Sequence, residues 1–198
     1  AAFGQNESIT PMQMATAVAA IANGGYLVTP YVVDSISDKD GNIISQTETN
    51  IRRQVLSEEV SRQLLAMMEN NVHGAGNYHS CANAYVAGYR IGGKTGTADK
   101  GKTGDVVVSF MCFAPADDPK YIMLLTMDTP RRDTGTAVYG GTMVAPVAGQ
   151  IMGEILPALG IEPNYSASEL AGADAAVPYV VGKSAADAKA ALKAAGFA

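Results

Sequence analysis

The chain has 198 residues, 47% of them hydrophobic, which is enough apolar material to fill the core of one domain and to begin a second. Nineteen acidic residues against fourteen basic ones give a formal net charge of −5, and the lysines and arginines are scattered along the sequence. We therefore expect neither a disordered chain nor a surface that follows the phosphates of a nucleic acid.

Two features bear on targeting. Residues 1–6 contain neither a basic start nor an apolar core, so no signal peptide is expected there. The longest apolar segment, residues 143–159, is interrupted by two prolines and two polar residues and falls short of the roughly 20 apolar residues that a membrane helix needs. Any membrane anchor is expected outside these 198 residues.

The first third of the chain predicts a helix, a hairpin and a second helix. Thr10 and Gln13 form a capping box that begins a helix, and Gly24-Gly25 ends it. Residues 31–37 and 42–47 are rich in β-branched residues, and the turn sequence at residues 38–41 predicts that they pair as a hairpin. Ser57 caps the next helix, and its expected buried stripe is Val60, Leu64, Met68 and Val72.

The middle of the chain predicts a sheet followed by a helix. After a polar loop at residues 74–84, three segments read as extended, 86–97, 105–114 and 121–127, and their short connections favour an antiparallel meander. A helix should then run from about residue 140 to Gly160 with Val144, Val147, Ile151 and Ile155 in line. The predicted fold class is α+β, an antiparallel sheet flanked by helices.

The C-terminal part reads as a linker followed by a new unit. Residues 161–176 are rich in Ala, Ser and Gly and show no periodicity, which is typical of a linker. Residues 177–182 read as a short strand and turn, and a capping box at Ser184 and Asp187 begins an alanine-rich helix that should end at Gly196.

The cysteines and histidines offer little chemistry. Cys112 lies in an apolar run and is expected to behave as a small buried hydrophobe, whereas Cys81 lies in a polar stretch. Their separation neither requires nor excludes a disulfide. His73 and His79 flank a glycine-rich loop without a third ligand, so no metal site is expected.

The stretch GYRIGGKTGTADKGKTG, residues 88–104, permits more than one interpretation. Residues 88–95 fit the phosphate-loop pattern G-x-x-x-x-G-K-[ST], and residues 122–128 imitate its Mg²⁺-binding strand. A phosphate loop needs a helix that begins at Lys94, yet Gly96, Gly101 and Gly104 would break such a helix. Two alternatives remain: a solvated lysine in a glycine-rich turn, or the K-T-G triad of serine acyl-transfer enzymes.

A strand that contains Lys-Thr-Gly-Thr suits acyl transfer. Lys94 and the hydroxyl of Thr95 can hold a substrate carboxylate, while Gly96 leaves room for the substrate backbone against the strand. A backbone N–H at this edge can also face a developing oxyanion.

Four motifs in the same order resemble the transpeptidase domain of class B penicillin-binding proteins. They are Phe3-Gly4-Gln5 with residues 10–15, residues 92–98, residues 109–121, and Gly140-Gly141-Thr142 with Ala145-Pro146. The tail, residues 177–197, resembles the first part of a PASTA module, a wall-associated repeat. The resemblance implies residues 1–160 as the C-terminal part of a transpeptidase domain with the penicillin-binding protein/serine β-lactamase-like fold, a linker at 161–176 and an incomplete PASTA module at 177–198.

The resemblance also implies a function. Proteins of this family cross-link peptidoglycan: a serine attacks the D-alanyl-D-alanine of a stem peptide, and β-lactams acylate the same serine. The implied roles are catalytic for Lys94 and Thr97, substrate-binding for Thr95, Gly96 and Thr97, and oxyanion donation for the Thr97 amide. No cofactor is implied. The implied location is the extracytoplasmic face of the membrane, in a Gram-positive bacterium, among other cell-wall synthesis proteins such as those of division.

The family's S-x-x-K and S-x-N signatures are absent from this sequence. We therefore expect these 198 residues to be inactive on their own. A penicillin-sensing or muropeptide-binding protein without turnover is the alternative, and a serine β-lactamase would share the fold. Membrane spans upstream would distinguish a sensor, and an anchor with a pedestal domain would distinguish a transpeptidase.

Overall fold

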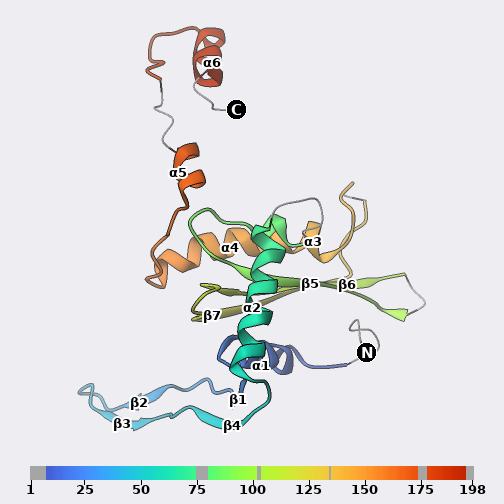
Figure 1. Ribbon diagram of the computed structural model, residues 1–198, viewed down its shortest axis with the longest axis vertical. Helices are drawn as coiled ribbons and strands as arrows, with labels where there is room; N and C mark the ends of the chain where they lie inside the picture. The colour runs from blue at the N-terminus through green and yellow to red at the C-terminus, as the bar shows by residue number, and fades with distance from the viewer. Residues whose placement is uncertain (1–7, 75–79, 102–103, 134, 174–177, 195–198) are drawn as a thin grey trace.

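The computed structural model describes residues 8–74, 80–101, 104–133, 135–173 and 178–194 (Figure 1). At its centre lies an antiparallel sheet of three strands, β5 (Gly92–Asp99), β6 (Val106–Ala114) and β7 (Tyr121–Asp128), in the order β5-β6-β7. The expected α+β class and the meander are confirmed. Among the described residues, the edge strands β5 and β7 each pair with β6 alone.

The central strand β6 is fully buried on one face and partly buried on the other. Its even-numbered residues, among them Phe110 and Cys112, pack with helix α4 (Ala145–Ala158) in the larger hydrophobic cluster. Its odd-numbered residues Met111 and Phe113 belong to a second cluster with helices α1 (Pro11–Ala22) and α2 (Glu58–His73). Alternation along the strand thus gives the sheet a helical layer on each face.

The predicted helix starts are confirmed. Thr10 and Gln13 form the reciprocal capping box of α1, and the Ser57 hydroxyl accepts the amide proton of Val60 at the start of α2. The predicted stripe of α2 was wrong in half of its members: Val60 is exposed and Leu64 half-buried, whereas Ser61 and Leu65 are buried with Met68 and Val72. Ser61 points inward because its hydroxyl donates to the carbonyl of Ile21, in the last turn of α1, where carbonyls lack partners within the helix.

An arm of two-stranded pairs extends from α1. The predicted hairpin is confirmed in shorter form as β2 (Ser35–Ser37) and β3 (Ile43–Gln46). A second pair was not predicted: β1 (Tyr26–Thr29) and β4 (Asn50–Gln54) run antiparallel to each other and connect the hairpin to α1 and α2. Figure 1 shows this arm reaching away from the three-stranded sheet.

The first half of the predicted strand 86–97 was wrong. A 3-10 helix, η1 (Ala82–Ala84), is followed by a tight turn in which Val86 forms an isolated bridge with Tyr89 and Gly88 takes a φ of +77°. Pro163 and Tyr165 pack so closely on Gly88 that a Cβ there would lie 2.8 Å from each. The strand therefore begins only at Gly92.

The helix predicted from residue 140 is confirmed in two pieces, α3 (Gly140–Met143) and α4, which meet at Val144. Val144 is buried as expected, but Val147 is exposed, and the buried face instead consists of Ala145, Ala148, Gly149, Met152 and Leu156. Small residues occupy this face because α4 lies against η1. A Cβ on Gly149 would lie 3.1 Å from the Ala84 Cα.

The C-terminal part contains two further helices, α5 (Ala167–Ala173) and α6 (Ala185–Ala194). The stretch expected as a linker thus includes a helix. The predicted short strand was wrong, because residues 178–180 form an irregular segment, but the turn predicted after it is present at residues 181–182. Val177 lies outside the described residues. The helix predicted after Ser184 is confirmed as α6, whose first-turn amide of Asp187 donates to the Ser184 hydroxyl. The division into domain, linker and PASTA module stays a prediction.

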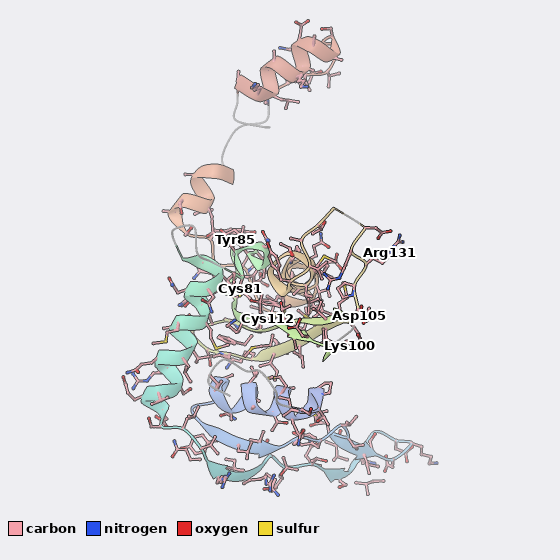
Figure 2. The ribbon with its side chains drawn as sticks, turned by 90° about the vertical axis from the view of Figure 1, so that its right-hand side faces the viewer. Cys81, Tyr85, Lys100, Asp105, Cys112 and Arg131 are labelled. Carbon is pink, nitrogen blue, oxygen red and sulfur yellow. The ribbon has the colours of Figure 1, made fainter. Side chains whose placement is uncertain are left out.

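Both cysteines are fully buried and free, in the interior shown in Figure 2. Burial raises the pKa of the Cys112 thiol to about 12, as the prediction of a buried hydrophobe implied. In the part of the chain that the structure describes, no helix is both long and apolar enough to cross a membrane.

Candidate active site

The outer edge of β5 is defined by its hydrogen bonds to β6. The carbonyl of Arg90 accepts from Ala116 N at 2.8 Å. At the far end of the hairpin, where Figure 2 labels Lys100 and Asp105, Lys100 N donates to the carbonyl of Asp105 at 2.8 Å. The register is continuous from Gly92 to Asp99. Backbone groups alternate between the two sides of a strand. The N–H and C=O groups of even-numbered residues therefore point to β6, and those of odd-numbered residues point to the outer edge.

Contacts on the other side agree with this assignment. The amide of Ile91 donates to His73 Nε2 at 3.0 Å, and the carbonyl of Gly93 accepts from Asn71 Nδ2 at 3.2 Å. The carbonyl of Thr95 accepts from Lys94 Nζ at 2.8 Å. By the same alternation the amide of Thr97 points to the outer edge.

The four predicted site residues are consecutive, so β5 brings them together and divides them between two faces. Lys94 and Gly96 pair with Met111 and Ser109 of β6 and share the face that α1 covers elsewhere. Thr95 and Thr97 lie on the opposite face, where α3 begins. The Lys94 side chain is exposed, Thr95 and Gly96 are half-buried, and Thr97 is exposed.

The Gly140-Gly141 turn at the start of α3 places Gly140 against the face of β5 that carries Thr95 and Thr97. Gly140 N donates to Thr97 Oγ1 at 3.3 Å. A Cβ on Gly140 would lie 2.5 Å from the Ser109 carbonyl oxygen and 3.0 Å from Thr95 Cβ. The first residue of α3 can therefore approach the strand only because it lacks a side chain. Asn83 Nδ2 donates to the Gly141 carbonyl at 2.8 Å and fixes the turn from the side of η1.

A neighbouring side chain within the protein also favours glycine at position 96. A Cβ at this position would lie 2.5 Å from Ser109 Oγ on the neighbouring strand. The absence of a side chain thus accommodates Ser109 and also leaves this part of the edge strand flat.

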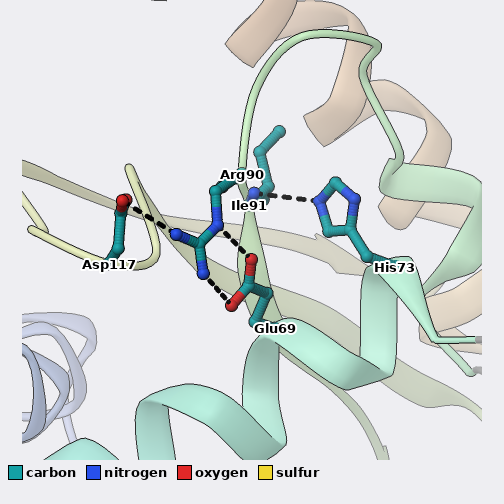
Figure 3. A network of polar contacts seen from close by, with 5 residues as sticks. All are labelled: Glu69, His73, Arg90, Ile91 and Asp117. Atoms are coloured by element: carbon teal, nitrogen blue, oxygen red, sulfur yellow. Dashed lines mark hydrogen bonds and ion pairs between the residues drawn. The ribbon is translucent and has the colours of Figure 1, made fainter. Parts of the chain in front are cut away.

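Helix α2 fixes the start of β5 by a polar network (Figure 3). Arg90 forms a bidentate ion pair with Glu69, with Nε–Oε1 at 2.6 Å and Nη2–Oε2 at 2.7 Å, and its Nη1 lies 2.8 Å from Asp117 Oδ2. These bonds, that to Glu69 above all, raise the pKa of Arg90. The network ties α2, the entry to β5 and the β6–β7 connection together.

Sequence reasoning missed this network and the neighbouring contacts of Asn71 and His73 with the backbone of residues 91 and 93. Asn71 and His73 lie 22 and 18 residues before their partners Gly93 and Ile91, in no motif. The sequence favours a cap or surface role for His73 over a metal ligand. Its ring accepts a hydrogen bond from a backbone amide instead, while His79 lies outside the described residues. No group of three or more potential metal ligands occurs among the described residues.

The phosphate-loop alternative does not fit this geometry. Lys94 and Thr95 lie within an extended strand paired with β6, whereas phosphate binding of that kind needs a helix N-terminus at this point. The glycine-rich turn does not fit either, because Lys94, although its side chain is exposed, lies inside the strand β5.

The family model of the penicillin binding protein transpeptidase domain matches residues 1–153. The chain therefore belongs to the penicillin-binding protein transpeptidase family, in agreement with the resemblance seen in its motifs.

Relatives and solved structures agree. The chain is 42% identical over 178 residues to stage V sporulation protein D of Bacillus subtilis, covering 85% of this chain and 26% of that protein. It is 32% identical over 168 residues to peptidoglycan D,D-transpeptidase FtsI of Escherichia coli K12, covering 82% and 26%. The chain thus spans about a quarter of the length of these relatives.

Two solved structures share the fold. The transpeptidase domain of penicillin-binding protein 3 from Burkholderia pseudomallei is 31% identical with a TM-score of 0.62, over 80% of this chain and 45% of that one. Penicillin-binding protein 3 from Mycobacterium tuberculosis, complexed with ampicillin, is 25% identical with a TM-score of 0.67, over 83% and 38%.

Proposed function

We propose that these residues form the C-terminal part of the transpeptidase domain of a longer D,D-transpeptidase, which cross-links peptidoglycan stem peptides by serine acyl transfer and is acylated by β-lactams. The observation that supports this most is the Lys94–Thr97 run on an edge strand whose odd-numbered backbone groups point outward. Relatives named as peptidoglycan D,D-transpeptidases support the reaction class.

We assign a role to each residue of the run, and its position on the strand supports that role. Lys94 supplies a positive charge next to the reacting serine of the longer protein and takes part in its proton transfers. The Thr95 and Thr97 hydroxyls bind the carboxylate of D-alanyl-D-alanine or of a β-lactam. The Thr97 amide, on the outer edge, donates to the oxyanion of the tetrahedral intermediate, while Gly96 leaves the acyl chain room against the strand.

The remaining assignments go further. Residues 1–160 belong to the catalytic domain, residues 177–198 begin a PASTA module, and residues 161–176 connect the two. The longer protein acts on the extracytoplasmic face of the membrane, held by an anchor outside these residues, together with other cell-wall synthesis proteins. A Gram-positive source and a role in division stay predictions from the resemblance.

Intact mass spectrometry after exposure to ampicillin tests the proposal. The longer protein should gain one covalent adduct, on a serine upstream of residue 1, while the 198-residue chain gains none because it lacks S-x-x-K. An adduct on the 198-residue chain would refute its expected inactivity. A folded longer protein without an adduct would refute the transpeptidase assignment and favour a binding-only relative.

A further inference from the structure

Two side chains from the end of α2 occupy the outer edge of β5 immediately before the proposed substrate-binding residues. His73 accepts from the Ile91 amide, and Asn71 donates to the Gly93 carbonyl. The next two odd-numbered residues along the same edge are Thr95 and Thr97. The end of α2 therefore determines where the accessible part of the edge begins and how β5 is placed at that point.

The bond to Ile91 requires one protonation state of His73. Nε2 can accept only when it carries no proton, so the ring must be neutral with its proton on Nδ1. A protonated ring would present a donor to a donor, and because Ile91 is fully buried its amide would lose its partner away from water. Protonation of His73 is thus incompatible with the observed position of Ile91.

The groups that surround His73 belong to its own helix, α2, and to three other segments. The Tyr85 ring lies 5.1 Å away, edge-on, and the Tyr85 hydroxyl donates to Glu169 of α5. Glu69 and Arg90 lie on the remaining side (Figure 3). Burial lowers the pKa of His73 below 6.5, and Arg90 acts in the same direction, while the carboxylates of Glu69 and Glu169 oppose this shift.

We propose that His73 is a positioning residue for acylation: its neutral ring, by accepting the Ile91 amide proton, holds β5 in the place where Thr95 and Thr97 meet the acyl group. This inference rests on the proposed function. It predicts that acid loosens the entry to β5. The folded state disfavours the protonated ring. The contribution of neutral His73 to the stability of this region is therefore complete above pH 6.5 and is lost as the pH falls through the lowered pKa of His73.

The test compares acylation of the longer protein by a fluorescent penicillin at several pH values, for the wild type and His73→Gln. Glutamine keeps an acceptor for the Ile91 amide but does not titrate between about pH 5 and 8. The wild-type rate divided by the variant rate should be constant above about pH 7 and fall progressively as the pH is lowered below 6.5. A ratio that stays constant over the whole range would overturn the proposal.

A control and a second measurement complete the test. Asn71→Ala removes the neighbouring contact to β5, which does not titrate, so it should slow acylation equally at every pH; a change in its pH profile relative to wild type would count against the assignment to His73. Hydrogen–deuterium exchange of the wild-type peptide with Ile91, corrected for the intrinsic rate, should lose protection as the pH is lowered through the pKa of His73, while the centre of β6 keeps it. Retained protection would refute the inference without reference to acylation, whereas absence of acylation at every pH would refute the proposed function instead.

Discussion

The three-stranded sheet and the arm differ in what stabilises them, although both contain large apolar residues. In the sheet, β6 is covered on both faces, and Phe110, Cys112 and Phe113 are completely buried. In the arm, Ile36, Ile43, Ile44 and Ile51 are all more than half exposed. The arm keeps its shape through backbone pairing and its turn, where Asp38 accepts from the amides of Asp40 and Asn42. Residue type alone therefore does not decide burial; the position of the helices does.

The largest expected effect on the free energy of unfolding comes from replacing an isoleucine by alanine, a change that can be made in the sheet region and in the arm. Ile91→Ala, at the fully buried entry to β5, should lower the free energy of unfolding of the 198-residue chain by about 2–5 kcal/mol. Ile44→Ala, at a position 69% exposed in the arm, should change it by no more than about 0.5 kcal/mol. Urea unfolding followed by circular dichroism measures both.

The pair is matched because the same atoms are removed. Equal losses at the two positions would contradict the difference between sheet and arm. A large loss at Ile44 only in the longer protein would instead show that further chain covers the arm there.

A second, intermediate effect is expected where the sheet meets α3. Gly140→Ala would bring a Cβ within 2.5 Å of the Ser109 carbonyl oxygen, so it should cost about 1–3 kcal/mol and slow acylation of the longer protein. Gly153→Ala, in α4, is the control: its Cβ would come no nearer than 3.4 Å to Val86, and helix propensity should raise stability by up to about 1 kcal/mol. Similar effects of both substitutions would show that Gly140 is not placed against β5 as described.

The smallest expected effect concerns α5, which, like the arm, lies outside the three-stranded sheet. Glu169 accepts from the Tyr85 hydroxyl, from Ser166 N at 2.6 Å and from Gly88 N at 3.0 Å, and these bonds, that from Tyr85 first, lower its pKa to about 2. Glu169→Ala should release α5 and speed proteolytic cleavage between residues 160 and 173 without a measurable change in the unfolding of the sheet.

The pH dependence of this attachment has a defined sign. Because the pKa of Glu169 is lowered in the folded state, its contribution is complete above about pH 4.5 and is lost as the pH falls towards 2. Cleavage of the wild type should therefore accelerate only in that acid range, measured with pepsin. Glu169→Gln should be cleaved at a rate that no longer depends on this titration; a persistent acid step in this variant would contradict the role of Glu169.

Local signals in the sequence predicted much of the fold. Capping residues at Thr10, Ser57 and Ser184 act within one turn, so they could be recognised without the rest of the chain. The same holds for the candidate site, because Lys94–Thr97 are consecutive and their order along a strand determines which face each occupies. The four residues were therefore predictable together with their strand.

Features that depend on distant partners could not be predicted. Ser61 replaces an apolar residue in the buried stripe of α2 only because a carbonyl of α1 needs a donor. Strand β4, with the sequence Asn-Ile-Arg-Arg-Gln, lacks an apolar alternation and pairs with β1 through its backbone. His73 and Asn71 reach β5 across about 20 residues, and no spacing in the sequence indicates that contact.

The central claim is that the outer edge of β5 from Thr95 to Thr97 faces the acyl group. A crystal structure of the longer protein acylated by ampicillin tests it most directly. We predict that the carbonyl oxygen of the acyl group lies within hydrogen-bond distance of the Thr97 amide and the drug's carboxylate beside the Thr95 and Thr97 hydroxyls. An acylated serine whose adduct makes no contact with residues 94–97 would contradict the account.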